Sequence, residues 1–124
     1  MLVVKTKLKE FPEKGIGLIA DQEIKKGQTV WVYNPIIDIK INEKDIPEPA
    51  KDFFNTYAVD IGEDYLCLSI DNNRFLNHSE KPNIKSLGSF EDNIALRDIN
   101  IGEEITIDYN EIDVNGINFN NKIL

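Results

Sequence analysis

Cysteine and histidine are almost absent from this chain of 124 residues, which contains one of each, Cys67 and His78. A single cysteine excludes an internal disulfide and any cysteine-based zinc site. Cys67 lies in an apolar run, residues 65–68, which favours a small buried core residue over a nucleophile. His78 has no accompanying cluster of metal-ligating residues, so the sequence predicts no metal site.

Long hydrophobic runs are also missing. No segment has the length and apolar character of a signal peptide or of a membrane-spanning helix. The sequence therefore predicts no association with a membrane, and the cytoplasm is the expected location, or the nucleus or a host compartment if such a context exists.

Positive charge is scarce, because 14 Lys and Arg residues face 22 Asp and Glu residues, for a formal net charge of −8. Binding to nucleic acid requires clustered Lys and Arg, so direct contact with nucleic acid is not expected. An acidic surface attracts basic partners such as a lysine-rich segment, although many soluble proteins are acidic without having such a partner.

The length fits one domain spanning residues 1–124. Short β-type runs alternate with turns rich in Gly, Pro and Asn, which indicates a mainly β fold. Strands are expected at residues 2–4, 18–20, 29–33, 36–41, 65–70, 94–99 and 105–109. The best helix candidate is residues 48–55, because Pro49 suits a first helical turn and acidic residues suit the positive end of its dipole.

Two dense segments dominate the second half of the chain. Residues 74–83 read Arg-Phe-Leu-Asn-His-Ser-Glu-Lys-Pro-Asn, and residues 102–109 read Gly-Glu-Glu-Ile-Thr-Ile-Asp-Tyr. Taken alone, the first is typical of a polar loop with Asx-type turns, and a tyrosine that closes an apolar strand is usually a core residue. Together they resemble the two signature segments of the SET-domain protein lysine methyltransferases, with every fixed position filled, in order and at family-like spacing.

The resemblance implies a SET-domain (β-clip) fold of short strands in small sheets, with little helix and a C-terminal pseudoknot. It also implies that S-adenosylmethionine is the methyl donor and that the acceptor is a lysine side-chain amine of a protein or peptide. The function expected from it is protein lysine N-methyltransferase.

Several donor-binding residues follow from the resemblance. Asn77 and His78 are expected to contact S-adenosylmethionine, and Arg74 to lie at the same site. An asparagine amide offers both donors and an acceptor to a polar ligand. Tyr57 resembles one member of a donor-contacting pair, although simple core packing explains it equally well.

A glycine turn, Lys14-Gly15-Ile16-Gly17, resembles the Gly-x-Gly turn whose backbone lies along the donor in the family. Without that context, two glycines between strands predict only a turn. The middle residue is often aromatic in the family, so Ile16 keeps the shape and loses the stacking. Lys14 and Ile16 are expected to contribute mainly through their backbone.

Tyr109 occupies the position of the catalytic tyrosine. The acceptor amine must be neutral to attack, although a free lysine has a pKa of about 10.4. A nearby sulfonium and an apolar channel disfavour the charged form, and a tyrosine hydroxyl can then orient the amine alongside backbone carbonyls. A neutral phenol is a poor base, so water is the expected route for the proton.

Four residues are expected on the substrate side. Tyr33 ends a strand that the family places near the substrate amine, and core packing explains it equally well. Ile107 stands two residues before Tyr109, where an aromatic residue is common, so its smaller side chain predicts room for more than one methyl transfer. Because no cysteine-rich zinc segment follows Tyr109, Phe119 and Ile117, or a second subunit in a homodimer, are expected to close the lysine channel.

Two other functions remain open. The first is a catalytically silent SET-fold module that binds S-adenosylmethionine or a lysine-bearing peptide, which the missing zinc segment and Ile16 favour. The second is a structural β-rich domain. The expected partner of the enzyme is a lysine-containing and basic protein or peptide.

Overall fold

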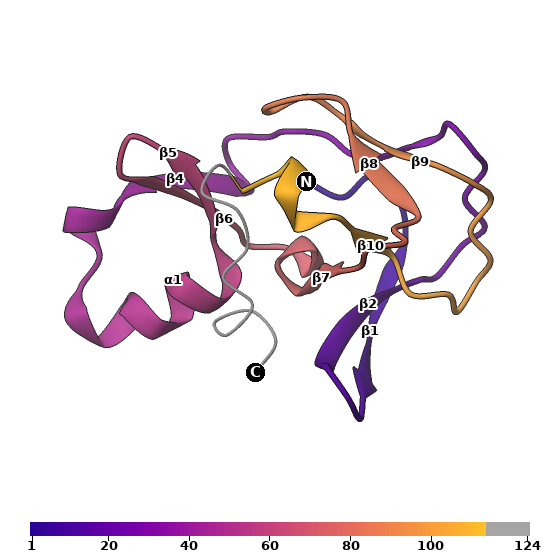
Figure 1. The fold of residues 1–124 in the computed structure, drawn as a ribbon, viewed down its shortest axis with the longest axis horizontal. Coiled ribbons are helices and arrows are strands. Elements are labelled where there is room, and N and C mark those ends of the chain that lie inside the picture. Colours follow the sequence, from indigo (N-terminus) through magenta and orange to yellow (C-terminus); the bar gives the residue numbers. More distant parts are fainter. Residues whose placement is uncertain (114–124) are drawn as a thin grey trace.

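The computed structural model describes residues 1–113, which form short strands and few helices (Figure 1). In chain order the strands are β1 (Thr6–Phe11), β2 (Gly15–Ala20), β3 (Thr29–Trp31), β4 (Asp38–Asn42), β5 (Val59–Gly62), β6 (Tyr65–Ser69), β7 (Asn77–His78), β8 (Ile84–Ser86), β9 (Asn93–Ala95) and β10 (Thr106–Ile107). The α-helix is α1 (Lys51–Tyr57), and the 3-10 helices are η1 (Glu43–Asp45), η2 (Glu48–Ala50), η3 (Asn72–Phe75) and η4 (Tyr109–Glu111). Within residues 1–113, no helix is long and apolar enough to cross a membrane.

The strands form four small sheets. β1 and β2 form a hairpin, β9 lies between β3 and β8, and β6 lies between β4 and β5. The fourth sheet pairs β7 with β10 in parallel, with Thr106 opposite Asn77 and Ile107 opposite His78. Two segments about thirty positions apart in the chain thus lie side by side, and the mainly β fold is confirmed.

Two hydrophobic clusters stabilise the molecule. The larger one joins the hairpin, β3, β8, β9 and β10, and its largest fully buried members are Leu18, Ile24, Val30, Ile84, Ile99, Ile105 and Ile107. The smaller one lies between α1 and the β4–β6–β5 sheet and contains Ile46, Ala58, Leu66 and Leu68. Figure 1 shows α1, β4, β5 and β6 on one side of β7 and β10, and the hairpin on the other. Residues of both parts can therefore face a site near β7 and β10.

The strand predictions were right in type and often wrong in extent. The expected strand at residues 2–4 is a single bridge between Leu2 and Trp31. The runs at 94–99 and 105–109 shorten to β9 and β10, and Tyr109 begins η4. β1 was missed because its middle residues are exposed, so cross-strand pairing with β2 forms this strand without an apolar pattern.

The glycine segment also differs from its prediction. Gly15–Gly17 opens β2, and the turn lies one step earlier at residues 12–14. Gly15 has a φ of 76°, a backbone conformation that glycine adopts readily. The expected helix at 48–55 is the 3-10 turn η2 followed by α1.

Candidate active site

Pairing of β7 with β10 places Tyr109 beside His78. The Tyr109 backbone N–H donates to Nδ1 of His78 at 3.0 Å, and the two rings lie 5.4 Å apart. An Nδ1 that accepts a hydrogen bond carries no proton, so the neutral imidazole has its proton on Nε2. The histidine thus helps to fix the backbone from which the tyrosine ring projects.

The Tyr109 phenol is buried, with 8% of the residue exposed. Its hydroxyl donates to the backbone carbonyl of Leu76 at 2.5 Å. Burial raises the pKa of Tyr109 to about 12, and the negative charge of Glu104 acts in the same direction. At neutral pH the hydroxyl is therefore protonated, and its oxygen can accept a hydrogen bond.

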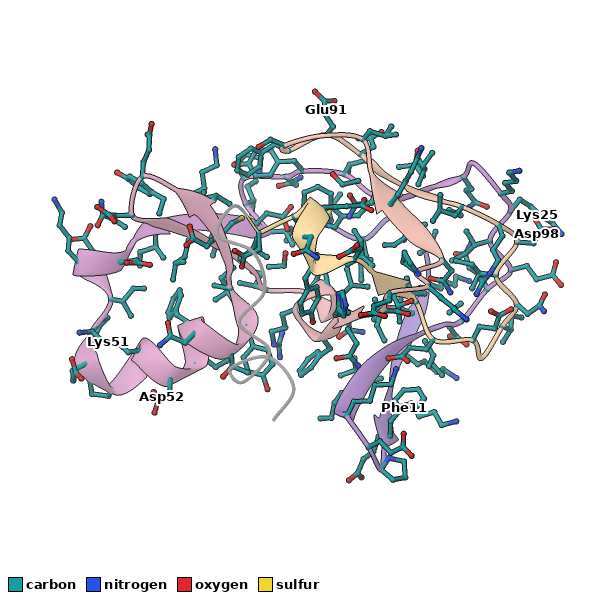
Figure 2. The ribbon with its side chains drawn as sticks, in the orientation of Figure 1. Phe11, Lys25, Lys51, Asp52, Glu91 and Asp98 are labelled. Carbon is teal, nitrogen blue, oxygen red and sulfur yellow. The ribbon has the colours of Figure 1, made fainter. Side chains whose placement is uncertain are left out.

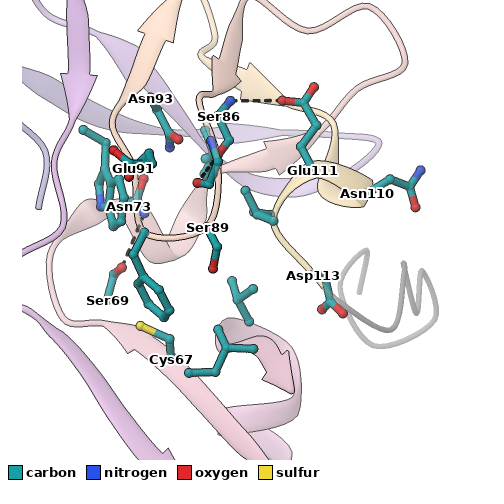
Figure 3. Close-up of a pocket in the computed structure, with 17 residues that line it drawn as sticks. Cys67, Ser69, Asn73, Ser86, Ser89, Glu91, Asn93, Asn110, Glu111 and Asp113 are labelled. Atoms are coloured by element: carbon teal, nitrogen blue, oxygen red, sulfur yellow. Dashed lines mark hydrogen bonds between the residues drawn. The ribbon is translucent and has the colours of Figure 1, made fainter. Parts of the chain in front are cut away.

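A small cavity of about 50 Å³ lies against Tyr109, and its lining includes Tyr57, Arg74 and Leu76. A larger cavity of about 210 Å³ adjoins it (Figure 3). Seven residues line both cavities: Val59, Cys67, Ser69, Asn73, Leu76, Ile112 and Asp113. The two spaces are thus neighbours separated by a shared wall of mostly small and apolar side chains.

The larger cavity combines aromatic walls with acidic groups. Trp31 and Phe90 line it, together with the acidic residues Glu91, Glu111 and Asp113. None of its described lining residues is a Lys or an Arg. The Ser86 backbone N–H donates to Glu111 at 3.0 Å, which ties this carboxylate to β8 (Figure 3). A cationic side chain entering this cavity would meet negative charge and aromatic faces.

Two polar atoms of the larger cavity wall have no hydrogen-bond partner in the described part of the chain. They are Nε1 of Trp31 and Oδ1 of Asn73, both buried. Buried polar atoms are usually paired, with protein or with an ordered ligand or water. These two atoms therefore offer one donor and one acceptor to a molecule that enters the cavity.

Asn77 and the glycine segment meet through a carboxylate. The Asn77 Nδ2 donates to Glu104 at 2.9 Å and to the Ile16 carbonyl at 3.3 Å, and Lys14 forms an ion pair with the same carboxylate. A Cβ at Gly17 would lie 2.5 Å from Oε2 of Glu104 and 2.9 Å from Nδ2 of Asn77. Only glycine fits there without displacing these side chains, so the backbone of β2 approaches the polar group closely.

Arg74 lies in η3, shortly before β7 in the chain, and lines the small cavity. Its guanidinium lies 4.5 Å from the centroid of the Phe75 ring and donates to the carbonyls of Ile70 and Asp71 at 3.2 and 3.4 Å. Tyr57 packs edge-on against Phe75 at 5.4 Å. The structure thus brings Arg74, Tyr57 and Tyr109 together around one cavity.

The predicted residues on the substrate side are more scattered. Tyr33 packs edge-on against Phe90 at 4.9 Å and lies 6.5 Å from Trp31, and it contributes to the lining of neither cavity. Ile107 is fully buried in the larger hydrophobic cluster and also lines neither cavity. Phe119 lies outside the described residues. Lys14 was expected to contribute mainly through its backbone, but its side chain also forms an ion pair with Glu104.

The sequence reasoning gave no role to Glu104 and Asn83. The Asn83 side chain donates to the Glu104 carbonyl at 2.7 Å and accepts from the Thr106 backbone N–H at 2.9 Å. Both residues occupy fixed positions of the signature segments, which is the signal that could have identified them. Trp31 and Asn73 carry no such signal, because only the fold brings them to the cavity.

Comparison with known proteins agrees with this geometry, since the family model of the SET domain matches residues 15–110. The chain belongs to the SET-domain family. A histone-lysine N-methyltransferase, H3 lysine-36 specific, of Candida albicans is 31% identical over 121 residues, which span 86% of this chain and 14% of that protein. This SET domain therefore covers only a small part of the length of the relative that it matches.

A solved structure shows the same fold. The crystal structure of a Plasmodium falciparum protein proposed to be a histone methyltransferase has a TM-score of 0.60 and 23% sequence identity to this SET domain. The similarity covers 86% of this chain and 93% of the other. It confirms the SET-domain fold that the two signature segments predicted.

Proposed function

We propose that this SET domain is an S-adenosylmethionine-dependent protein lysine N-methyltransferase. One observation carries the proposal: a buried, protonated tyrosine hydroxyl, that of Tyr109, lines a small cavity that adjoins a larger one lined with acidic groups. This arrangement provides an acceptor for an amine N–H where the amine would enter from the acidic side.

The residues present fit the methyl donor. Gly17 lets the backbone of β2 lie close against Asn77 and Glu104, and Nε of Arg74 is buried without a hydrogen-bond partner in the described chain. Tyr57 and Arg74 line the small cavity beside Tyr109. When bound, S-adenosylmethionine supplies an electrophilic methyl group on a positively charged sulfur.

Tyr109 positions the acceptor amine. Its hydroxyl donates its proton in a hydrogen bond to the Leu76 carbonyl, so the lone pairs on Oη accept a hydrogen bond from an N–H of the incoming amine. Such orientation of the amine lowers the barrier by holding it in line for attack. Tyr109 retains its own proton at neutral pH because its pKa is about 12, so the proton that the amine loses passes to water.

The larger cavity selects a basic substrate. Glu91, Glu111 and Asp113 attract a cationic side chain to the larger cavity, whereas burial beside the apolar Val59, Leu76 and Ile112 of the shared wall disfavours the charged form of the amine. A lysine is thus drawn in as a cation and is favoured as a neutral amine near Tyr109. We expect methylation of lysines in basic stretches of protein.

Tyr109→Phe tests the proposal, because it removes the hydroxyl and keeps the ring. Transfer of labelled methyl groups to a lysine-rich protein extract should fall at least about 100-fold, as expected for loss of a positioning contact. Donor binding measured by calorimetry should remain within about twofold, because the ring that lines the small cavity is kept. Tyr65→Phe, at an exposed end of β6, is the matched control and should transfer normally.

Two results would contradict the proposal. Normal transfer by Tyr109→Phe would remove Tyr109 from the mechanism. Donor binding by the unmodified chain with no transfer to any lysine would favour the catalytically silent module, for which the 47% exposure of aliphatic Ile16 is the supporting observation. A homodimer that completes the channel stays a prediction, which light scattering tests.

A further inference from the structure

Glu104 is placed to control the orientation of Asn77. Its side chain is only 13% exposed, and its two oxygens have different partners. Oε1 forms the ion pair with Lys14, and Oε2 accepts from Nδ2 of Asn77 at 2.9 Å. The backbone of Glu104 is also fixed, by a bridge to Ile19 in β2 and by the Asn83 side chain. Contacts of both the side chain and the backbone of Glu104 therefore hold its carboxylate in place.

The orientation of an asparagine amide determines whether it presents a donor or an acceptor. Both contacts of Asn77, with the Glu104 carboxylate and with the Ile16 carbonyl, are with groups that only accept. Its NH₂ group must therefore face these two acceptors, and its Oδ1 is the end turned away from them. Asn77 consequently offers an acceptor oxygen to a ligand on its side away from β2.

The donor implied by the proposed function is cationic. S-adenosylmethionine carries a sulfonium and an ammonium group, whereas its fragment 5′-methylthioadenosine has an uncharged thioether and no amino-acid part. An acceptor oxygen favours the first ligand, and an outward-facing NH₂ group would repel its cations. Discrimination between these two ligands thus depends on which way the Asn77 amide is turned.

We propose that Glu104 is a positioning residue that holds the Asn77 amide with its oxygen toward the cationic part of the methyl donor. Lys14 occupies the second oxygen of Glu104 and balances its charge, so the carboxylate acts through Asn77. Glu104 is thus not a direct ligand of the donor. This inference rests on the proposed function, because it concerns the same donor.

Glu104→Gln tests this role with nearly the same shape. Glutamine has an NH₂ group that can donate to Oδ1 of Asn77, so the amide is no longer fixed in one orientation. Calorimetry should show S-adenosylmethionine binding weakened about tenfold, as for loss of one charge-assisted contact, with 5′-methylthioadenosine binding unchanged. Glu103→Gln, on the exposed neighbouring carboxylate, is the matched control and should change neither affinity.

A double-mutant cycle separates a positioning role from a structural one. If Glu104 acts through Asn77, Glu104→Gln should weaken S-adenosylmethionine binding no further in an Asn77→Ala background. Equal weakening of both ligands, or additive effects of the two substitutions, would overturn the proposal. Failure of the unmodified chain to bind S-adenosylmethionine would instead overturn the proposed function.

Glu104→Asp provides an independent variant if Glu104→Gln lowers the thermal midpoint. It keeps the charge and withdraws the carboxylate by one carbon–carbon bond, about 1.5 Å, from Asn77. The same selective loss of S-adenosylmethionine affinity is expected. Full retention of the S-adenosylmethionine affinity would show that a negative charge at residue 104 supports binding whatever its distance from Asn77. That result would contradict a positioning role.

Discussion

Tyr109 illustrates how a single residue acquires its properties from its surroundings. A tyrosine in water ionises near pH 10, and burial in this fold shifts ionisation to about pH 12. In the proposed mechanism the hydroxyl contributes through its geometry, since it donates to the Leu76 carbonyl and its oxygen can accept a hydrogen bond from an incoming amine. Burial thus makes the phenol a weaker acid, and its hydrogen bond to Leu76 fixes the orientation of the hydroxyl.

This shift predicts a pH dependence of stability. Below pH 10 the phenol is protonated in both the folded and the unfolded chain, so the contribution of Tyr109 to stability is fully present. Between pH 10 and about pH 12 only the unfolded chain releases this proton, so the free energy of unfolding falls by about 1.4 kcal/mol per pH unit. Urea unfolding of the unmodified chain and of Tyr109→Phe over this range measures the difference.

The comparison with Tyr109→Phe is needed because other tyrosines and lysines ionise in the same range. Plotted against pH, the free energies of unfolding of the two proteins should differ in slope above pH 10 and run parallel below it. Parallel curves over the whole range would show that the Tyr109 phenol ionises normally in the folded state.

At the scale of elements, the loop that ends at Asn83 holds β10 in place. The Asn83 side chain bonds to the backbone on both sides of Ile105, and its own N–H donates to the Thr106 carbonyl at 3.2 Å. The residue is 2% exposed, so it supplies hydrogen bonds to backbone groups that water cannot reach. The short parallel pair β7–β10 depends on this support, because two residues in each strand give little stability alone.

Asn83→Ala should therefore destabilise the fold strongly. Removing the amide leaves a buried N–H of Thr106 and a buried carbonyl of Glu104 unpaired, which should lower the free energy of unfolding by about 2–4 kcal/mol. Urea unfolding at neutral pH measures the loss. Asn100→Ala, in an exposed turn, is the matched control and should change stability by less than about 0.5 kcal/mol. A loss below about 1 kcal/mol for Asn83→Ala would show that other contacts hold β10.

At the scale of the whole molecule, charge is the dominant surface property. The chain carries a formal net charge of −8, and three carboxylates line the larger cavity. The labelled side chain of Glu91 points outward from the β8–β9 connection (Figure 2). The basic substrate that we propose would therefore be attracted over a range that salt shortens, to about 8 Å at physiological ionic strength.

The KM for a basic substrate should consequently rise with salt. We expect a synthetic peptide with arginines beside its lysine to show a several-fold higher KM at high salt than at low salt, and an alanine-flanked peptide to show little change. Glu91→Gln should reduce this salt dependence. Glu43→Gln, on η1 and away from both cavities, is the matched control. Equal salt dependence of the two peptides would argue against an electrostatic role for the cavity.

Both signature segments are recognisable in the sequence because they concentrate residue types that the proposed chemistry requires. Asn77, His78 and Tyr109 stand at fixed positions of these segments, and the fold brings them together through β7 and β10. The positions of Tyr33 and Ile107 were less predictable, because strand register determines which face of a sheet a side chain occupies. A shift of one residue in register moves the side chain to the opposite face.

The sequence by itself determined the family, the mainly β class and the presence of one catalytic tyrosine candidate, since these depend on local residue types and their order. Tertiary structure alone decided that Trp31 and Asn73 face the same cavity and that Glu104 bridges Lys14 and Asn77. Such contacts join residues that lie tens of positions apart, so they leave no local pattern in the sequence. Each of them also contributes only a small free energy. They form only when the packing of the whole chain fixes where each backbone segment lies.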